Sequence, residues 1–415
     1  MRKSIHRGRS VQSILSSDPE VRRAFLREMI LSQMRDGVLG ALARMFREEV
    51  MVLCGPFKAR KGPRGLLWRG GSERGSVYLE GRRVPVRRPR VRNGHGEHTL
   101  ASYEALRDFD LLSEDLKPYL LAGVSTRDYR KLVRKLEEDL PGPSKATVSR
   151  AFGRACSKDL DVLNGRDLSG YTFAALVFDA TEVAGVSVLA GVGVTPGGEK
   201  VLLGLWEGHS ENTTLARDFL VSLRDRGLKT LSRVLVILDG SKGLRKGILQ
   251  VLGEGQAVVQ RCQVHKQRNV CEYLPKHQHA EVGRRLKAAY GAKTYAEAKR
   301  MLETTRRWLE VTSPSAARSL AEGLEETLTV HRLALPEPLR RHFRSTNLIE
   351  STFAGVKDLI RRVKRWRNTK QAVRWVAAGL AERERRFKKL KGYRALPALT
   401  EALQKTNLEN NQETA

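Results

Sequence analysis

The chain of 415 residues is long enough for about two to four domains, and its hydrophobic content of 40% excludes a disordered chain. Lysine and arginine number 76 against 46 aspartate and glutamate residues, which gives a formal net charge of +30. Such a surplus predicts a polyanionic partner, most often nucleic acid, although a ribosome-associated or simply basic protein would have the same composition.

The four cysteines are Cys54, Cys156, Cys262 and Cys271, and none forms a Cys-x-x-Cys pair. A disulfide framework is therefore not expected, and a reducing cytoplasm fits this pattern better. The basic residues 1–10 are not followed by an apolar signal core, and no run approaches the ~20 apolar residues that span a bilayer. We expect a soluble intracellular protein without membrane association.

Residues 1–98 are predicted to form a mainly helical region with a small β-hairpin. Residues 16–55 have the pattern of two amphipathic helices, with Ser17 or Asp18 as the first cap and Pro19 in the first turn. Residues 60–71 indicate a loop rich in glycine and arginine. Residues 75–92 alternate around Glu80-Gly81 like a hairpin with basic residues on its exposed side. Those charges fit solvated strand edges and DNA contact equally well.

Residues 99–165 are predicted to hold a helix-turn-helix that binds DNA. Apolar residues recur with helical spacing in residues 125–140, Pro141 to Pro143 stop that helix, and Ser144 begins a second one through residue 155. An ordinary helical hairpin would have the same pattern. The polar residues of the second helix that would face a groove are Lys145, Thr147, Ser149, Arg150 and Arg154.

After Gly170 the pattern changes to that of strands. The order is three strands, a helix, a strand, a helix and a strand; the ranges are 171–183, 186–194, 200–208, 210–228, 233–239, 243–253 and 257–264. This order predicts an α/β core with a mixed sheet of the ribonuclease-H-like type. A nucleotide-binding α/β domain competes with it, but Gly191 and Gly193 lie between strands and do not open a helix.

The rest of the chain is predicted to be helical. We expect residues 166–270 to be the first part of the core, 271–343 a helical insertion, and 344–400 the last helices of the core. The polar end, residues 401–415, is expected to be a disordered tail.

Three carboxylates stand out against this framework. Asp179 ends the apolar run 173–178, and Asp239 ends the run 234–238. A buried carboxylate without a partner is costly, so each aspartate either caps the next turn or serves chemistry. Glu350 lies at the start of a helix whose basic residues share its face, namely Lys357, Arg361 and Lys364. The simpler alternative is a glutamate that stabilises the helix dipole above a solvated basic face.

At these positions the chain resembles the Mutator-type bacterial insertion-sequence transposases of the DDE superfamily. The matching segments are FDATEV around Asp179, LGLWEGHSENTTLARDFLVSLRDRGL, LVILDGSKGL around Asp239, RCQVHKQRNV and TNLIES around Glu350. The similarity extends from about Asp36 to Phe387, through VPVRRPRVR and GVSTRDYRKL, in the order expected for the family. One departure is that Glu350-Ser351 is followed by Thr352-Phe353, where the family usually has Leu-Asn.

The resemblance implies a ribonuclease-H-like catalytic core in which Asp179, Asp239 and Glu350 bind two Mg²⁺ ions, for which Mn²⁺ can substitute. Carboxylate oxygens suit such hard cations, and two ions roughly 3.5–4 Å apart can neutralise both the attacking and the leaving oxygen of a phosphodiester. The gap of 350 − 239 = 111 residues matches the helical insertion of the family. The cations that would then approach DNA phosphates are Lys357, Arg361 and Lys364.

Cys262 and His265 form the Cys-x-x-His element of this family. A supporting role beside the active site, a zinc site that recruits Cys271, His277 or His279, and an ordinary packed pair all remain open, although the spacing is irregular for zinc.

The resulting prediction is a transposase that binds the terminal repeats of an insertion sequence, cleaves DNA and transfers the 3′-hydroxyl ends to target DNA. We expect it to act as a homodimer or higher oligomer on DNA, in the bacterial cytoplasm at the nucleoid. The alternatives are another nuclease or integrase of the same fold, or a catalytically silent DNA-binding repressor.

Overall fold

The computed structural model describes residues 19–413, except 57–65, 80–81, 108–116, 118–119, 122–123, 125–144, 184, 209–211, 362, 364–365 and 367. Two compact units divide the chain, one made of residues 1–120 and 124–152, the other of residues 121–123 and 153–415. Within the described residues, no helix combines the length and the apolar composition needed to cross a membrane.

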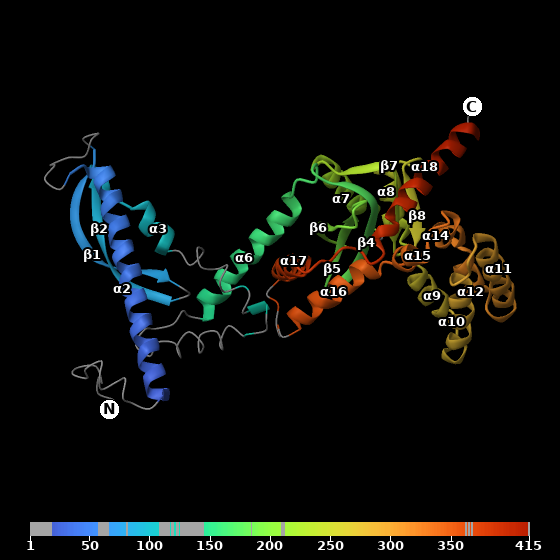
Figure 1. Cartoon of the computed structure of the whole chain (residues 1–415), viewed down its shortest axis with the longest axis horizontal. Coiled ribbons are helices and arrows are strands. Elements are labelled where there is room, and N and C mark those ends of the chain that lie inside the picture. Colours follow the sequence, from blue (N-terminus) through green and yellow to red (C-terminus); the bar gives the residue numbers. More distant parts are fainter. Residues whose placement is uncertain are drawn as a thin grey trace. The chain divides into compact units, whose positions relative to one another are not determined.

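The first unit packs helices against a small antiparallel sheet (Figure 1). Its elements are α2 (Pro19–Cys54), β1 (Trp68–Leu79), β2 (Arg82–Asn93), β3 (Gly96–His98) and α3 (Ala101–Arg107). The hairpin predicted around Glu80-Gly81 is confirmed, because Leu79 pairs with Arg82 and Val77 with Val84. Phe46 of α2 and Tyr103 of α3 are buried and pack edge to face against each other.

The first unit also corrects two expectations. The two helices predicted in residues 16–55 are one helix, α2, because Gly37 and Gly40 keep helical backbone angles; glycine in a helix costs about 1 kcal/mol relative to alanine but does not end it. β1 begins at Trp68, inside the predicted loop, and an irregularity between Arg69 and Ser72 absorbs the glycines there.

Only the second helix of the predicted helix-turn-helix lies in the described part of the chain. It is α6 (Lys145–Gly165), which continues well beyond the predicted end at residue 155. Val148, Phe152 and Ala155 of its apolar stripe are buried. The first helix, predicted at residues 125–140, lies outside the described residues.

The second unit contains a five-stranded mixed sheet with the order β6-β5-β4-β7-β8. The strands are β4 (Thr172–Val183), β5 (Val186–Val194), β6 (Lys200–Glu207), β7 (Lys229–Leu238) and β8 (Ala257–Arg261). β4 pairs antiparallel with β5 and parallel with β7, and β7 is parallel to β8. The predicted mixed α/β class is therefore confirmed.

Many helices accompany this sheet. They are α7 (Thr213–Asp225), α8 (Lys242–Leu252), α9 (Gln263–Cys271), α10 (Lys276–Tyr290), α11 (Tyr295–Thr312), α12 (Pro314–Ala321), α13 (Leu324–Thr327), α14 (Thr329–Arg332), α15 (Glu337–Phe343), α16 (Asn347–Ile360), α17 (Thr369–Glu384), the 3₁₀ turn η2 (Tyr393–Ala395) and α18 (Leu396–Glu413). Residues 263–264, predicted as the end of a strand, belong instead to α9.

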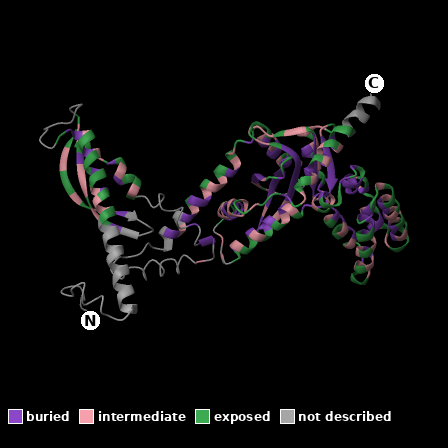
Figure 2. Cartoon of the chain, in the orientation of Figure 1, coloured by how far each residue is buried: buried purple, intermediate pink, exposed green. Residues whose placement is uncertain are grey.

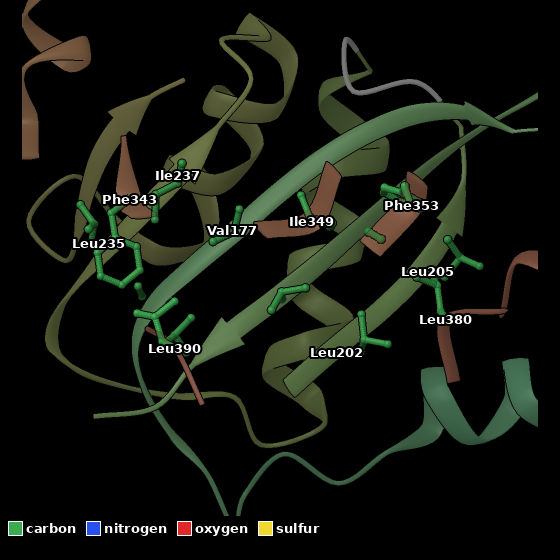
Figure 3. Packing of buried hydrophobic residues seen from close by; sticks show 14 of the residues in the cluster. Val177, Leu202, Leu205, Leu235, Ile237, Phe343, Ile349, Phe353, Leu380 and Leu390 are labelled. Atoms are coloured by element: carbon green, nitrogen blue, oxygen red, sulfur yellow. The ribbon is translucent and has the colours of Figure 1, made fainter. Parts of the chain in front are cut away.

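Successive residues of the buried strands serve two different cores. Val177 and Ile237 pack with Ile349 and Phe353 of α16 (Figure 3). Their neighbours on the other face of the sheet pack with α7 and α8. Figure 2 shows the sheet almost entirely buried between these layers. Side chains alternate along a strand, so residues two positions apart face the same way. Asp179 follows Val177, and Asp239 follows Ile237, by two positions, so both aspartates belong to the face of the sheet that α16 covers.

The polar end of the chain corrects another expectation. Residues 401–415 were expected to be disordered, but α18 runs from Leu396 to Glu413. Leu396, Leu399 and Leu403 lie on one side of this helix and are buried in the core, so packing fixes its first turns. The helix then continues into the polar sequence.

Candidate active site

Asp179 is a buried carboxylate with an unsatisfied oxygen. Its residue is 3% exposed, and its Oδ1 atom has no hydrogen-bond partner among the described residues. Burial raises the pKa of Asp179 from 3.8 to about 7; the charge of His265 opposes the rise and that of Asp239 adds to it. A buried oxygen in this state is suited to a cation.

Asp239 lies beside Asp179 at the same edge of the sheet. β4 and β7 are parallel neighbours with Val177 opposite Ile237, so Asp239, which directly follows β7, lies level with Asp179, from which β4 continues to Val183. The Oδ1 atom of Asp239 accepts the backbone N–H of Ser241 at 2.9 Å. One carboxylate oxygen thus stabilises the turn before α8, as predicted by the alternative in which Asp239 caps the turn. The same carboxylate can still take part in the active site.

Glu350 reaches the site from α16, far away in the sequence. Ile349 and Phe353 of the same helix are buried against the sheet and fix the helix there. The chain returns to the sheet just before α16, since the N–H of Gln263 donates to the carbonyl of Arg344 at 2.9 Å. The structure thus brings Glu350 to the edge of the sheet that carries Asp179, whose pKa the charge of Glu350 raises further.

Cys262 and His265 border the same site from the end of β8. The N–H of Cys262 donates to Leu238 at 2.8 Å, and the Cys262 Sγ atom accepts the N–H of His265 at 3.5 Å. The side-chain hydrogen bond with Cys262 raises the pKa of His265 to about 9. Burial raises the pKa of Cys262, but its hydrogen bonds with His265 outweigh burial and lower it.

Among the described residues, one set of three potential ligands has all its atoms within 4.8 Å, namely Cys262, His265 and Glu350. Cys271, His277 and His279, one of which the zinc alternative would recruit, do not belong to this set. His279 instead contacts the carbonyl oxygen of Leu274 at 2.9 Å.

The predicted carboxylates Asp179, Asp239 and Glu350 do not form such a set, because their ligand atoms do not all lie within 4.8 Å of one another, but the chemistry of Asp179 fits a divalent cation. Asp179 offers a buried oxygen without a hydrogen bond, and oxygen donors are the ligands that Mg²⁺ prefers.

Only some of the residues predicted to bind DNA have side chains that the structure describes. Lys357 is exposed, and its Nζ atom donates to Thr181 Oγ1 at 2.9 Å, two residues beyond Asp179 on β4. Arg361 is exposed at the end of α16, and Lys364 lies outside the described residues. In α6, Ser149 is half-buried and Arg154 is exposed. The side chains of Lys145, Thr147 and Arg150 are not described.

Four of the hairpin arginines form two contrasting pairs. Arg88 and Arg90 form ion pairs with Glu73 and Glu97. Arg74 and Arg87 are both exposed and lie directly opposite each other on β1 and β2. Like charges in this position repel each other, which a bound polyanion would relieve.

Sequence reasoning missed two hydroxyl groups of the site, Thr346 and Thr181. Thr346 Oγ1 donates to Glu350 Oε1 at 2.8 Å, and Thr181 receives the hydrogen bond of Lys357. The position of Thr346 one helical turn before Glu350 was the available signal.

Comparison with known proteins gives this geometry a family context. The family model described as "Transposase, Mutator family" matches residues 20–390. The transposase of insertion sequence element ISRM5 from Rhizobium meliloti is 29% identical over 381 residues, covering 89% of each chain. The transposase of IS256 in transposon Tn4001 from Staphylococcus aureus is 26% identical, covering 71% of this chain and 75% of that protein.

One solved structure, a Drosophila P element transposase strand transfer complex, covers 72% of this chain and 92% of its own at 12% identity. Its TM-score of 0.25 is too low to bear on this fold.

Proposed function

This chain belongs to the Mutator family of transposases, enzymes of DNA transposition, and on this premise we propose that it moves an insertion sequence by cleavage and strand transfer. It binds the terminal repeats of the element, cleaves the DNA strands there with water, and transfers the freed 3′-hydroxyl ends to target DNA. Membership of the family implies a divalent metal cofactor.

The active site of this proposal consists of Asp179, Asp239 and Glu350. The observation that carries it is the buried Oδ1 atom of Asp179, which has no hydrogen-bond partner among the described residues beside two further carboxylates. When bound, two Mg²⁺ ions, or Mn²⁺ in their place, supply charge neutralisation at the attacking and leaving oxygens. The three carboxylates would hold these ions, and Cys262 and His265 would support Glu350 from the side.

The strand order supports a ribonuclease-H-like core as the finer description of the fold. Three antiparallel strands, β6, β5 and β4, continue into the parallel pair β7 and β8, as predicted from the order of the elements. The helices between β8 and α16 would then be the insertion that precedes the last carboxylate.

DNA would be held by several basic surfaces. The helix-turn-helix would read the element ends through Lys145, Thr147, Ser149, Arg150 and Arg154. Near the active site, Lys357, Arg361 and Lys364 would contact phosphates without reading sequence. Arg74 and Arg87 of the hairpin would add phosphate contacts.

The working form would be a homodimer or higher oligomer assembled on DNA. It would act at the nucleoid in the bacterial cytoplasm, in line with the bacterial sources of the relatives. A catalytically silent repressor is the weaker alternative, because it has no use for a buried carboxylate that costs stability.

The test replaces each carboxylate by its amide: Asp179→Asn, Asp239→Asn and Glu350→Gln. Asparagine at 239 can still accept the hydrogen bond of Ser241, so loss of activity there would not reflect loss of the turn. Cleavage and strand transfer on labelled end DNA with Mg²⁺ should fail together in all three variants, while gel-shift binding survives.

Asp218→Asn, an exposed aspartate of α7 paired with Arg217, is the matched control and should stay active. Near-normal cleavage by any of the three amide variants removes that residue from the active site, and near-normal cleavage by all three refutes the proposed function.

A further inference from the structure

Thr346 is a buried threonine whose hydroxyl group does not make the hydrogen bond that its position at the start of a helix would predict. It is the N-cap residue of α16, and a threonine there usually accepts a backbone N–H of the first helical turn. Here its side chain makes no such bond, although the residue is 0% exposed. The hydroxyl instead donates to Glu350 Oε1 at 2.8 Å.

The other side of the same hydroxyl contacts the Cys-x-x-His element. Thr346 Oγ1 lies 3.4 Å from His265 Nδ1 and 3.6 Å from Cys262 Sγ. A hydroxyl has one hydrogen to donate and lone pairs with which to accept. With its hydrogen given to Glu350, the oxygen can accept from His265, so the three side chains form one hydrogen-bonded chain.

This chain ends on a single carboxylate oxygen. Thr346 holds Oε1 of Glu350, and Oε2 has no hydrogen bond from the described residues. Glu350 has three side-chain torsions and comes from a helix, so it is the carboxylate that most needs an external restraint.

We propose that Thr346 is a positioning residue that orients Glu350 for metal binding and couples Cys262 and His265 to it. This inference rests on the proposed function, since it assigns a task to Thr346 only if Glu350 binds metal. Removing a group that holds a metal ligand in place typically lowers metal affinity or activity by about 10–100-fold. The competing explanation is that the hydroxyl merely finds a partner for its own burial.

The test compares Thr346→Val, which keeps the shape and removes the hydroxyl, with Thr346→Ser, which keeps the hydroxyl. The matched control is Thr352→Val in the same helix, because Thr352 is also buried but donates to the carbonyl oxygen of Leu348 at 3.0 Å. Thr346→Ala gives the same expected result as the valine variant and serves if that variant fails to fold.

Two measurements apply to each variant: binding of Mn²⁺ to the free protein by calorimetry, and the Mg²⁺ concentration that gives half-maximal cleavage of end DNA. We expect Thr346→Val to weaken Mn²⁺ binding and raise the Mg²⁺ requirement by about 10-fold or more. Thr346→Ser should recover most of the loss, and Thr352→Val should behave as wild type. Affinity for end DNA should be unchanged in all.

Unchanged Mn²⁺ binding and Mg²⁺ requirement in Thr346→Val would overturn the inference, as would an equal loss in Thr352→Val. Glu350→Gln separates the two levels. If it abolishes cleavage while Thr346→Val has no effect, the inference about Thr346 fails alone. If Glu350→Gln cleaves normally, the proposed role of Glu350 fails first.

Discussion

The ammonium group of Lys357 donates to the hydroxyl of Thr181 at 2.9 Å and so links α16 to β4, two residues beyond Asp179. Thr181 is a neutral partner and Lys357 is exposed, so the positive charge stays available to a phosphate at the edge of the active site. Glu350 and Lys357 lie seven residues apart on one helix, which corresponds to about 10 Å along its axis.

Lys357→Met should therefore weaken binding of end DNA and reduce the salt dependence of binding by about one phosphate contact, a change of about 0.9 in the slope of log K against log salt. Thr181→Val is the control, since it removes the hydroxyl partner but keeps the cation. If Thr181→Val weakens binding of end DNA as much as Lys357→Met does, and neither variant changes the salt slope, Lys357 has a structural role and does not contact a DNA phosphate.

The core strands could be predicted because their sequences carry strong local signals. The run before Asp239 is apolar and rich in β-branched residues, and Gly227, predicted to end the preceding helix, has a φ of 84° that favours glycine. The start of α9 was missed because Cys262, an unusual cap, follows an apolar strand without a break. Likewise, the polar composition near the chain end hid the leucines that anchor α18.

The site itself was predictable only in part. The ends of two apolar runs marked Asp179 and Asp239, and a helix start marked Glu350, although β4 continues beyond Asp179 to Val183. The contact of Thr346 with His265 joins residues 81 positions apart and depends on how the helices between α9 and α16 bring the chain back to the sheet. Local sequence patterns do not encode such a contact, so tertiary packing alone reveals it.

Recognition of the element ends should depend on the predicted helix-turn-helix. Arg150→Ala and Ser149→Ala should weaken binding to end DNA by about 1–3 kcal/mol if these side chains meet base edges. Binding to random duplexes should hardly change, because the other basic surfaces supply it. A salt-matched competition assay measures both affinities. Equal affinities of wild type and variants for end and random DNA would refute the assignment.

The purified protein should contain well under one zinc ion per chain. Cys262, His265 and Glu350 are close enough to share an ion, but the raised pKa of His265 favours its protonated form, which cannot bind metal. Elemental analysis after dialysis provides the measurement. One tightly bound zinc that is lost in Cys262→Ser would show a structural zinc site instead.

The ion pair of Arg166 and Glu384 should be a main stabilising contact of the second unit. The two terminal guanidinium nitrogens of Arg166, Nη1 and Nη2, each donate to one oxygen of the Glu384 carboxylate at 2.6 Å, and the N–H of Leu202 donates to it at 2.8 Å. Glu384→Gln should lower the free energy of unfolding by about 2 kcal/mol, between the values for exposed and for buried pairs. Denaturant titration tests this, with Glu401→Gln in the exposed pair with Lys405 as the control expected to show no change.

The buried carboxylate of Asp179 should make the metal-free protein less stable as the pH rises. Its pKa is about 7 in the folded protein against 3.8 ordinarily, so between these values the folded protein keeps a proton that the unfolded chain has released. The free energy of unfolding must therefore fall as the pH rises through this window and level off above about pH 7. At about 1.4 kcal/mol for each pH unit, the full effect is about 4 kcal/mol.

Asp179→Asn removes this titration. With chelator present, the free energy of unfolding of the variant should therefore exceed that of wild type by more at about pH 8 than at about pH 5. Added Mg²⁺ should stabilise wild type at the higher pH and leave the variant nearly unaffected, because a bound cation offsets the charge that burial penalises. Denaturant titrations of both proteins at both pH values, with chelator and with Mg²⁺, give the four comparisons. A difference between variant and wild type that does not depend on pH would show that the buried carboxylate does not titrate in this window. A response to Mg²⁺ that is equal in both proteins would show that Asp179 is not where the cation binds.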